Sequence, residues 1–111
     1  MRTDERLDAV FAALADATRR RILLRLREGE ASVSDLAEPF DITLPAVSKH
    51  IAVLERAGLV KHRKTGRVRT CRLAAAPLKR AEAWIGQYER FWTTRFDALD
   101  AHLATLKKKD E

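Results

Sequence analysis

The sequence predicts a mainly α-helical fold with a small β-hairpin, and three observations lead to this class. Apolar residues recur at helical spacing over most of the chain, residues 34–57 contain two helical segments around a tight turn, and a basic hairpin follows over residues 59–73. Such a helix pair places its second helix in the major groove of DNA, and the hairpin completes a winged helix-turn-helix. We expect the N- and C-terminal helices to form a dimer interface.

Length and charge indicate one small domain with an acidic partner. Single domains favour about 100 to 150 residues, so for this chain of 111 we expect one domain over residues 1–106 and a polar tail over 107–111. Lys and Arg number 22 against 16 Asp and Glu, and the isoelectric point near 10.0 predicts attraction to polyanions such as nucleic acid. The apolar fraction of 46% excludes a disordered chain.

The cysteine count and the hydropathy pattern predict the compartment. A single cysteine cannot form an internal disulfide and suits a reducing environment. No apolar run has the length of a signal-peptide core or a membrane span. We therefore expect a cytoplasmic protein without a membrane partner.

The N-terminal part predicts two amphipathic helices. The first ends near residue 15 and has the 3.6-residue apolar period of a helix with one buried face. Asp16 is expected to cap the second, which runs over about residues 17–28 and stops at Gly29 in a left-handed conformation. The apolar positions of the first helix are Leu7, Val10, Phe11 and Leu14.

The next segment predicts the helix-turn-helix itself. Ser34 is expected to cap a short first helix, which Pro39 terminates. Thr43 then caps a second helix that continues to Arg56. Pro45 falls in its first turn, where a missing backbone N–H costs nothing.

The second helix of the pair has one apolar and one polar face. Val47, Ile51 and Leu54 fall at i, i+4 and i+7 and must face the body of the domain. The opposite face comprises Ala46, Ser48, Lys49 and His50. Its side chains are small, polar or cationic and lie at the end of the helix that enters the groove, with His50 toward the flank. The alternative is that these side chains are simply exposed, and Thr43 could contact a phosphate, cap its helix, or do both.

The hairpin is the most basic stretch of the chain. Its strands are expected over about residues 59–63 and 68–73, with Gly66 supplying the positive φ of a tight connection. A basic ribbon can follow a phosphate ridge or enter the minor groove, and a solvated hairpin that is basic by chance is the alternative. Cys71 lies on the same side as Leu73 and is expected to be half-buried. The basic members are Lys61, His62, Arg63, Lys64, Arg67, Arg69 and Arg72.

The last third of the chain predicts one long helix over residues 77–106, with apolar residues three or four positions apart. A monomer of this size cannot bury so long a stripe, so we expect the first and last helices to meet their copies across a two-fold axis. The alternative is a helix packed wholly on its own domain, and Gly86 either allows close approach or marks a kink. The predicted dimer contacts are Leu7, Val10, Phe11, Leu78, Ile85, Tyr88, Trp92, Phe96 and Leu99.

Three motifs occur in a distinctive order: FAALADATRRRIL at residues 11–23, SDLA at 34–37 and PAVSKHIAVLERAGLV at 45–60. Together they resemble the ArsR/SmtB type of winged-helix transcriptional regulator over roughly residues 7–73. The resemblance implies a homodimer, most often a repressor that leaves its operator when an inducer binds. It also implies that Lys64, Gly66 and Arg67 form the wing tip. The DNA-reading helix would then contain Thr43, Pro45, Ala46, Ser48, Lys49 and His50.

The metal sites of that family are incomplete in this sequence. Residues 32–34 are Ser-Val-Ser where thiolate sensors carry Cys-x-Cys, and serine hydroxyls are poor ligands for thiophilic ions. Asp100 and His102 match half of the other common site, but no histidine follows, and two ligands do not complete a tetrahedral site. We expect no metal and no cofactor, and the inducer is not identifiable. The C-terminal segment resembles the subgroup with an aromatic last helix.

These observations predict a sequence-specific DNA-binding transcriptional regulator that represses an inverted-repeat operator as a homodimer. A protein-interaction or scaffolding module on the same fold is the alternative, and a metal-responsive repressor is a less favoured one. Catalysis is not expected because the chain has no phosphate loop, paired carboxylates in an apolar setting, or nucleophile with a base. The predicted DNA contacts are Thr43, Pro45, Ala46, Ser48, Lys49, His50, Arg63, Lys64, Arg67 and Arg69.

Overall fold

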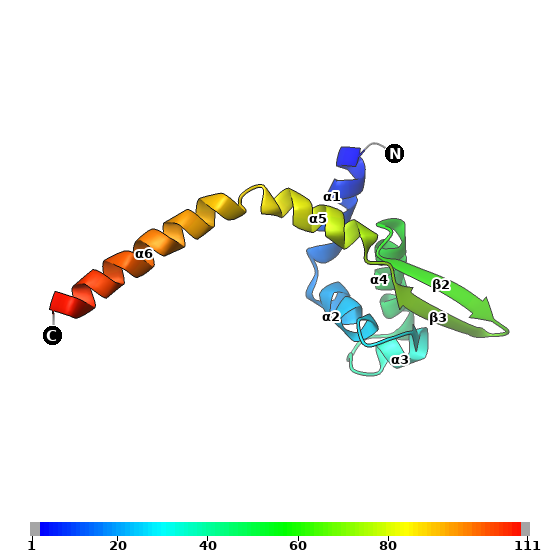
Figure 1. The fold of residues 1–111 in the computed structure, drawn as a ribbon. Helices are drawn as coiled ribbons and strands as arrows, with labels where there is room; N and C mark the ends of the chain where they lie inside the picture. Colours follow the sequence, from blue (N-terminus) through cyan, green and yellow to red (C-terminus); the bar gives the residue numbers. More distant parts are fainter. Residues whose placement is uncertain (1–2, 110–111) are drawn as a thin grey trace. The chain divides into compact units, whose positions relative to one another are not determined.

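The computed structural model describes residues 3–109, which form helices and three short strands. The chain divides into two compact units, one ending at Ala81 and the other beginning at Glu82. In chain order (Figure 1) the elements are α1 Thr3–Leu14, α2 Ala17–Leu26, β1 Ala31–Ser32, α3 Val33–Ala37, α4 Leu44–Arg56, β2 Val60–Thr65, β3 Val68–Leu73, α5 Ala76–Gly86 and α6 Glu89–Lys109.

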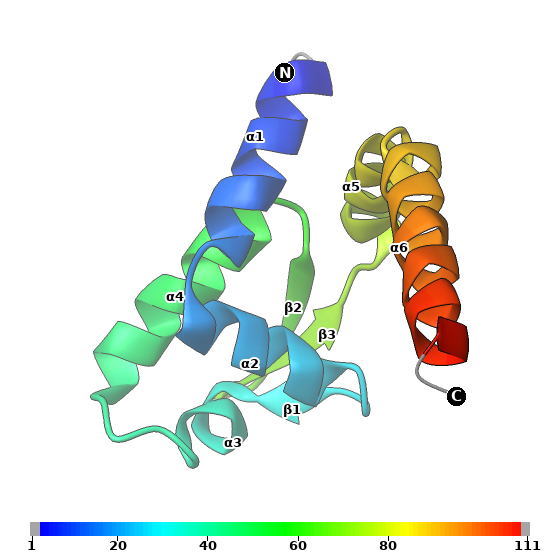
Figure 2. The same cartoon turned by 90° about the vertical axis from the view of Figure 1, so that its left-hand side faces the viewer.

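The hydrophobic core of the first unit lies between its helices and the small sheet (Figure 2). Helix α4 is the central element, since it contacts α1, α2, α3 and β2. Removing apolar surface from water at these contacts is the main force that holds the unit together. The large, fully buried side chains are Val10, Ile22, Leu36, Val47, Ile51, Leu54, Leu59, Val60 and Cys71.

Two arginines of the FAALADATRRRIL motif stabilise the joint between α1 and α2. Asp16 caps α2 as predicted, because its carboxylate accepts from the backbone N–H of Arg19 at 3.0 Å. The Arg19 side chain turns back and donates through Nε to the carbonyl of Ala13 at 2.7 Å. Arg20 donates through Nη1 to the carbonyl of Leu14, also at 2.7 Å. The two guanidinium groups therefore satisfy carbonyls that the end of α1 leaves without helical partners.

Helix α3 is capped by Ser32, so the prediction that Ser34 caps it is wrong. The Ser32 hydroxyl accepts from the backbone N–H of Asp35 at 3.1 Å, and the Asp35 carboxylate accepts from the backbone N–H of Ser32 at 3.3 Å. This reciprocal arrangement is a capping box. Ser34 lies one residue inside the helix, because the chain leaves β1 directly into the first turn.

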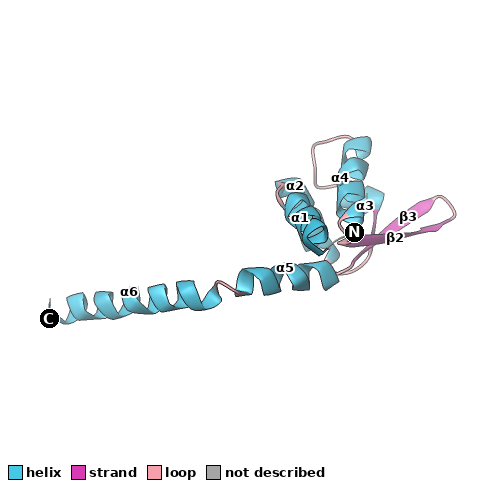
Figure 3. Ribbon diagram, turned by 90° about the horizontal axis from the view of Figure 1, so that it is seen from above, coloured by secondary structure: helices cyan, strands magenta, loops and turns pink. Residues whose placement is uncertain are grey.

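The hairpin belongs to a three-stranded antiparallel sheet of order β1-β3-β2. Strand β1 has no counterpart among the predicted elements, because two residues carry no periodic signal. Strand β2 begins at Val60 and extends to Thr65, which pairs with Val68. The turn is therefore Gly66 and Arg67, and Gly66 has the predicted positive φ, at 63°. Figure 3 shows this hairpin projecting away from α1, α2 and α4.

The predicted single helix over residues 77–106 is interrupted, so that prediction is wrong. Helix α5 ends at Gly86 and α6 begins at Glu89, and the N–H of Tyr88 bonds to the carbonyl of Ile85 at 3.0 Å in a tightened last turn. Gly86 is the last residue of α5 and therefore marks a break between the two helices, and within the described chain nothing lies within 4 Å of the space that a Cβ at Gly86 would take. None of the described helices is both long and apolar enough to span a bilayer.

Candidate nucleic-acid interface

The start of helix α4 is built as the sequence predicts. The Thr43 hydroxyl accepts from the backbone N–H of Ala46 at 3.2 Å, which makes Thr43 the N-cap. Pro45 lies in the first turn, where it interrupts no helical hydrogen bond. This end of the helix carries the positive end of the helix dipole, which favours a nearby anion.

The buried stripe of α4 determines which of its side chains point outward. Val47, Ile51 and Leu54 have no exposed surface. On the other side of the helix, Lys49 is exposed and Ser48 is partly exposed. The predicted orientation of these two residues is confirmed, whereas their contact with DNA stays a prediction.

His50 lies on the flank of α4 and contacts the start of α2. Its Nδ1 is 3.3 Å from Nη1 of Arg19 and 3.8 Å from Oδ2 of Asp16. The pKa of Asp16 lies below its ordinary value, mainly because the backbone N–H of Arg19 donates to the carboxylate, while nearby His50 and Arg19 lower it further against a desolvation effect. His50 thus joins α4 to the α1–α2 joint, which limits the freedom of its ring to reach a base.

The β2–β3 hairpin, called the wing from here on, carries cations with and without partners. Arg63 forms an ion pair with Glu30, with Nη2 of the arginine 3.0 Å from Oε2 of the glutamate. Among the described residues, no ion pair is found for Lys64, two residues before the turn, or for Arg67 within the turn. These two cations are therefore available for a phosphate at the end of the wing.

Glu55 of α4 contacts both long strands of the wing. Its Oε1 is 2.9 Å from Nδ1 of His62 in β2 and 3.2 Å from Nη2 of Arg69 in β3. Arg69, a predicted DNA contact, therefore has a carboxylate partner within the chain. Cys71 on the same sheet face is fully buried, more deeply than predicted, and burial raises the pKa of its thiol, with Glu55 adding to the effect.

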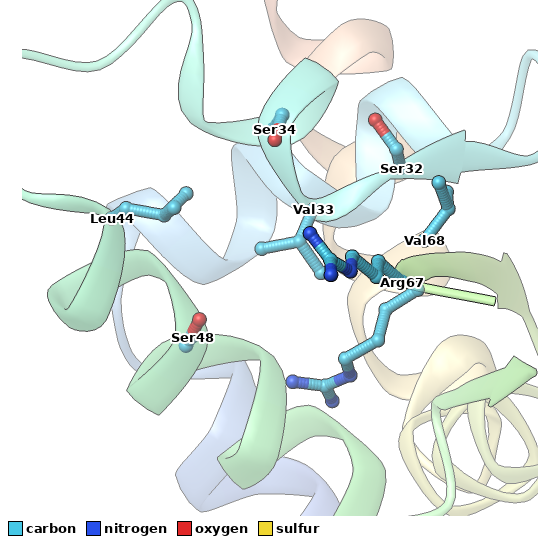
Figure 4. A pocket seen from close by; sticks show the side chains of 8 residues that line it. Ser32, Val33, Ser34, Leu44, Ser48, Arg67 and Val68 are labelled. Carbon is cyan, nitrogen blue, oxygen red and sulfur yellow. The ribbon is translucent and has the colours of Figure 1, made fainter. Parts of the chain in front are cut away.

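An open groove of about 340 Å³ lies between the first half of α4 and the wing (Figure 4). Ser48 borders it on the helix side and Arg67 on the wing side. Hydroxyl and guanidinium groups beside apolar side chains suit a sugar-phosphate strand. The wall formed by α3 is not predictable from the sequence pattern, because it depends on how α3 and β3 pack. The lining residues are Ser32, Val33, Ser34, Leu44, Ser48, Arg67, Val68 and Arg69.

Comparisons with known proteins agree with this geometry. A family profile described as a helix-turn-helix domain matches residues 14–63. The HTH-type transcriptional regulator Rv2034 of Mycobacterium tuberculosis is 40% identical over 86 residues, which are 78% of this chain and 78% of that protein. A crystal structure of an ArsR family transcriptional regulator, RHA00566, is 46% identical with a TM-score of 0.77, over 83% of this chain and 95% of the other. The chain belongs to the ArsR family of transcriptional regulators.

A third similar protein is described as a homodimer. The winged helix-turn-helix DNA-binding domain Mb0332 of Mycobacterium bovis, described as homodimeric and as a possible ArsR-family regulator, is 28% identical in its solution structure, with a TM-score of 0.63 over 78% of this chain and 80% of the other. The predicted family, the winged helix-turn-helix fold and the class of DNA-binding transcriptional regulator are thereby confirmed. This ArsR-family chain is a regulator and not an enzyme.

The predicted dimer contacts of this ArsR-family regulator differ in exposure. Val10 is 2% exposed in the core of its own unit, so the prediction that it needs a second copy to cover it is wrong. The side chain of Phe96 lies outside the described residues. The half-buried contacts, packed against the core, are Leu7, Phe11 and Leu78. The exposed ones are Ile85, Tyr88, Trp92 and Leu99.

The residues at the expected metal-ligand positions of this ArsR-family chain form no metal cluster within its described part. The hydroxyl of Ser32, at the position expected for a thiolate ligand, is used by the capping box of α3. Asp100 and His102 are exposed on α6. Within the described part of the chain, no group of three or more His, Cys, Asp or Glu side chains is arranged to hold a metal ion.

Proposed function

We propose that this regulator binds an inverted-repeat operator as a homodimer and represses transcription from it, with α4 in the major groove and the wing tip on the adjacent backbone. The observation that carries the proposal is the groove in which Ser48 of α4 faces Arg67 of the wing. In this proposal, Ser48 reads bases and Arg67 binds phosphate on neighbouring parts of one duplex.

Recognition is divided between the two elements. Ser48 and Lys49 project from the exposed face of α4 and are proposed to contact base edges. Pro45 and Ala46 keep the start of the helix slim enough to approach the groove floor, and the Thr43 hydroxyl can contact a phosphate while it caps the helix. Lys64 and Arg67 are proposed to contact phosphates, which adds affinity without base information.

The homodimer is supported by the second unit. Its aromatic and aliphatic side chains are exposed in the single chain, among them Tyr88, Trp92 and Leu99. Their burial against a second copy would remove this apolar surface from water, and a two-fold axis would present two copies of α4. Half-sites about 34 Å apart, one turn of duplex, would then be read together. A protein that binds an operator must share a compartment with DNA, so we also propose a cytoplasmic location.

Selection of bound duplexes from random DNA tests the proposal. The expected result is a palindromic consensus with half-sites one turn apart, bound by a species that sedimentation equilibrium shows to be a dimer. An asymmetric consensus would contradict the symmetric arrangement. A monomer that binds no duplex, even at low salt, would overturn the proposal as a whole.

Arg67→Glu separates the two proposed roles. We expect weaker binding to every duplex sequence and a salt dependence flatter by at least about one unit of slope, because one phosphate contact is lost and a repulsive charge is added. The measurement is affinity for operator and for unrelated DNA at several salt concentrations. If only operator affinity fell, the wing would be reading bases.

A further inference from the structure

Glu55 is the one described carboxylate that contacts both strands of the wing, and it does so from the DNA-reading helix. A single oxygen, Oε1, is 2.9 Å from Nδ1 of His62 and 3.2 Å from Nη2 of Arg69. The Glu55 side chain is only 22% exposed, so these contacts are less screened by water than an open surface pair. The contact therefore ties α4 to β2 and β3 at the same point.

The strand register explains why a carboxylate is needed there. His62 pairs with Cys71 and Lys64 pairs with Arg69, so the side chains of all four lie on one face of the hairpin. Like charges directly opposite each other, as at Lys64 and Arg69, destabilise a strand pair. A carboxylate beside Arg69 offsets that repulsion and holds the guanidinium toward α4.

The position of Arg69 connects this contact with the proposed DNA site. Arg69 lines the groove between α4 and the wing, together with Ser48 and Arg67. One N–H of its guanidinium faces Glu55, and an arginine has five N–H donors in a fixed fork, so donors remain for a ligand in the groove. Moving Arg69 would change the distance between the wing and the base-reading face of α4.

We propose that Glu55 is a positioning residue for DNA recognition: it sets the wing relative to α4 and holds Arg69 in place at the groove, so that operator and non-operator DNA are distinguished. The inference rests on the proposed function for its DNA readout. Without the Glu55 charge, Arg69 loses its carboxylate partner and its positive charge is released. General attraction to phosphate then rises while the fit to the operator is lost.

Glu55→Gln tests the proposal, and Glu30→Gln is its matched control. Both changes remove one negative charge, and both free a wing arginine, since Glu30 pairs with Arg63 at 3.0 Å. Only Glu55 lies on the DNA-reading helix. We expect E55Q to lower the ratio of operator to non-operator affinity by about fivefold, the upper range for one partly exposed ion pair, and to steepen the salt dependence of non-operator binding. E30Q should leave the ratio within about twofold of the wild type.

Two further measurements separate the positioning role of Glu55 from an effect of net charge. In an Arg69→Gln background, E55Q should have a smaller effect on the affinity ratio than in the wild type, because the two residues act together. Amide hydrogen exchange without DNA should be about fivefold faster in β2 and β3 of E55Q than of E30Q, since the wing has lost its attachment to α4.

The outcomes separate this inference from the proposed function. Equal changes in the affinity ratio for E55Q and E30Q would show a net-charge effect and overturn the positioning role. If the wild-type chain bound no duplex, the proposed function would fail. Amide hydrogen exchange would still show whether Glu55 attaches the wing to α4. Faster exchange in E55Q alone supports the attachment, and identical exchange in the two variants refutes it.

Discussion

The two units of this chain use the same apolar periodicity with opposite results. In the first, the apolar stripes of α1, α2 and α4 face one another, and Ile51 and Leu54 are 0% exposed. In the second, residues at the same helical spacing stay open, with Leu99 52% exposed. Periodicity therefore predicts a helix in both units, but burial needs a facing surface. The first unit supplies that surface from its own sequence, and we propose that a second copy supplies it for the other.

Breaking the closed core should give the largest effect. Ile51→Ala removes buried carbon atoms from the centre of α4 and should lower the free energy of unfolding by about 2 to 5 kcal/mol. Ile42→Ala is the control, because Ile42 lies in the turn before α4 and is exposed, and it should change the value by less than about 0.5 kcal/mol. Urea unfolding followed by circular dichroism measures both. Equal losses would contradict the contrast between core and surface.

The proposed DNA-reading face of the first unit can be tested separately from its core. Ser48→Ala with Lys49→Ala should reduce operator affinity by about 10- to 100-fold, the effect of one or two lost base contacts. The melting temperature and the dimer should be almost unchanged, because neither side chain is buried. Lys79→Ala, an exposed change on α5, is the control. Full operator affinity in the double variant would refute the assignment of α4.

The open face of the second unit is tested by a matched pair of leucines. Leu99 on α6 and Leu24 on α2 are 52% and 57% exposed in the single chain. Leu99→Ala should raise the dissociation constant of the dimer by about tenfold, because an interface side chain is lost. Leu24→Ala should leave it unchanged. Sedimentation equilibrium decides, and an equal response of the two leucines would remove the second unit from the interface.

The smallest expected effect concerns the joint at Asp16. Asp16→Ala should cost about 1 kcal/mol at pH 7, because the N-cap of α2 is lost. Since the folded state lowers the pKa of Asp16, its charged form contributes stability above its ordinary pKa of 3.8, and that contribution disappears as the pH falls through the lower folded value. The difference between D16A and wild type should therefore shrink at pH 3. Asp16→Asn keeps a capping side chain and isolates the charge.

Local signals predicted most of the first unit. Thr43 before Pro45 predicts a helix start, and Gly66 between two basic strands predicts a positive φ, because each depends on the conformation of a few neighbouring residues. The same reasoning placed the cap of α3 at Ser34 and not at Ser32. Both serines precede apolar positions, and only the pairing of β1 with β3 shows where the helix begins.

Side-chain partners were much less predictable. Arg63 and Arg69 look alike in sequence as wing cations, but each has a carboxylate partner, Glu30 and Glu55 respectively. Those carboxylates lie 33 and 14 residues away along the chain. The pairs form only because the hairpin packs beside β1 and α4, and no periodic pattern records that proximity.

The sequence by itself determined the helices, the turn between α3 and α4, the basic hairpin and the family, because these follow from short-range periodicity, capping and turn chemistry. Tertiary structure alone decided the third strand, the burial of Val10 within its own unit, and which wing cations have no ion pair among the described residues. The physical reason is the distance along the sequence over which each effect acts. Local conformational preference acts over a few residues, whereas burial and ion pairing depend on which distant segments the fold brings together.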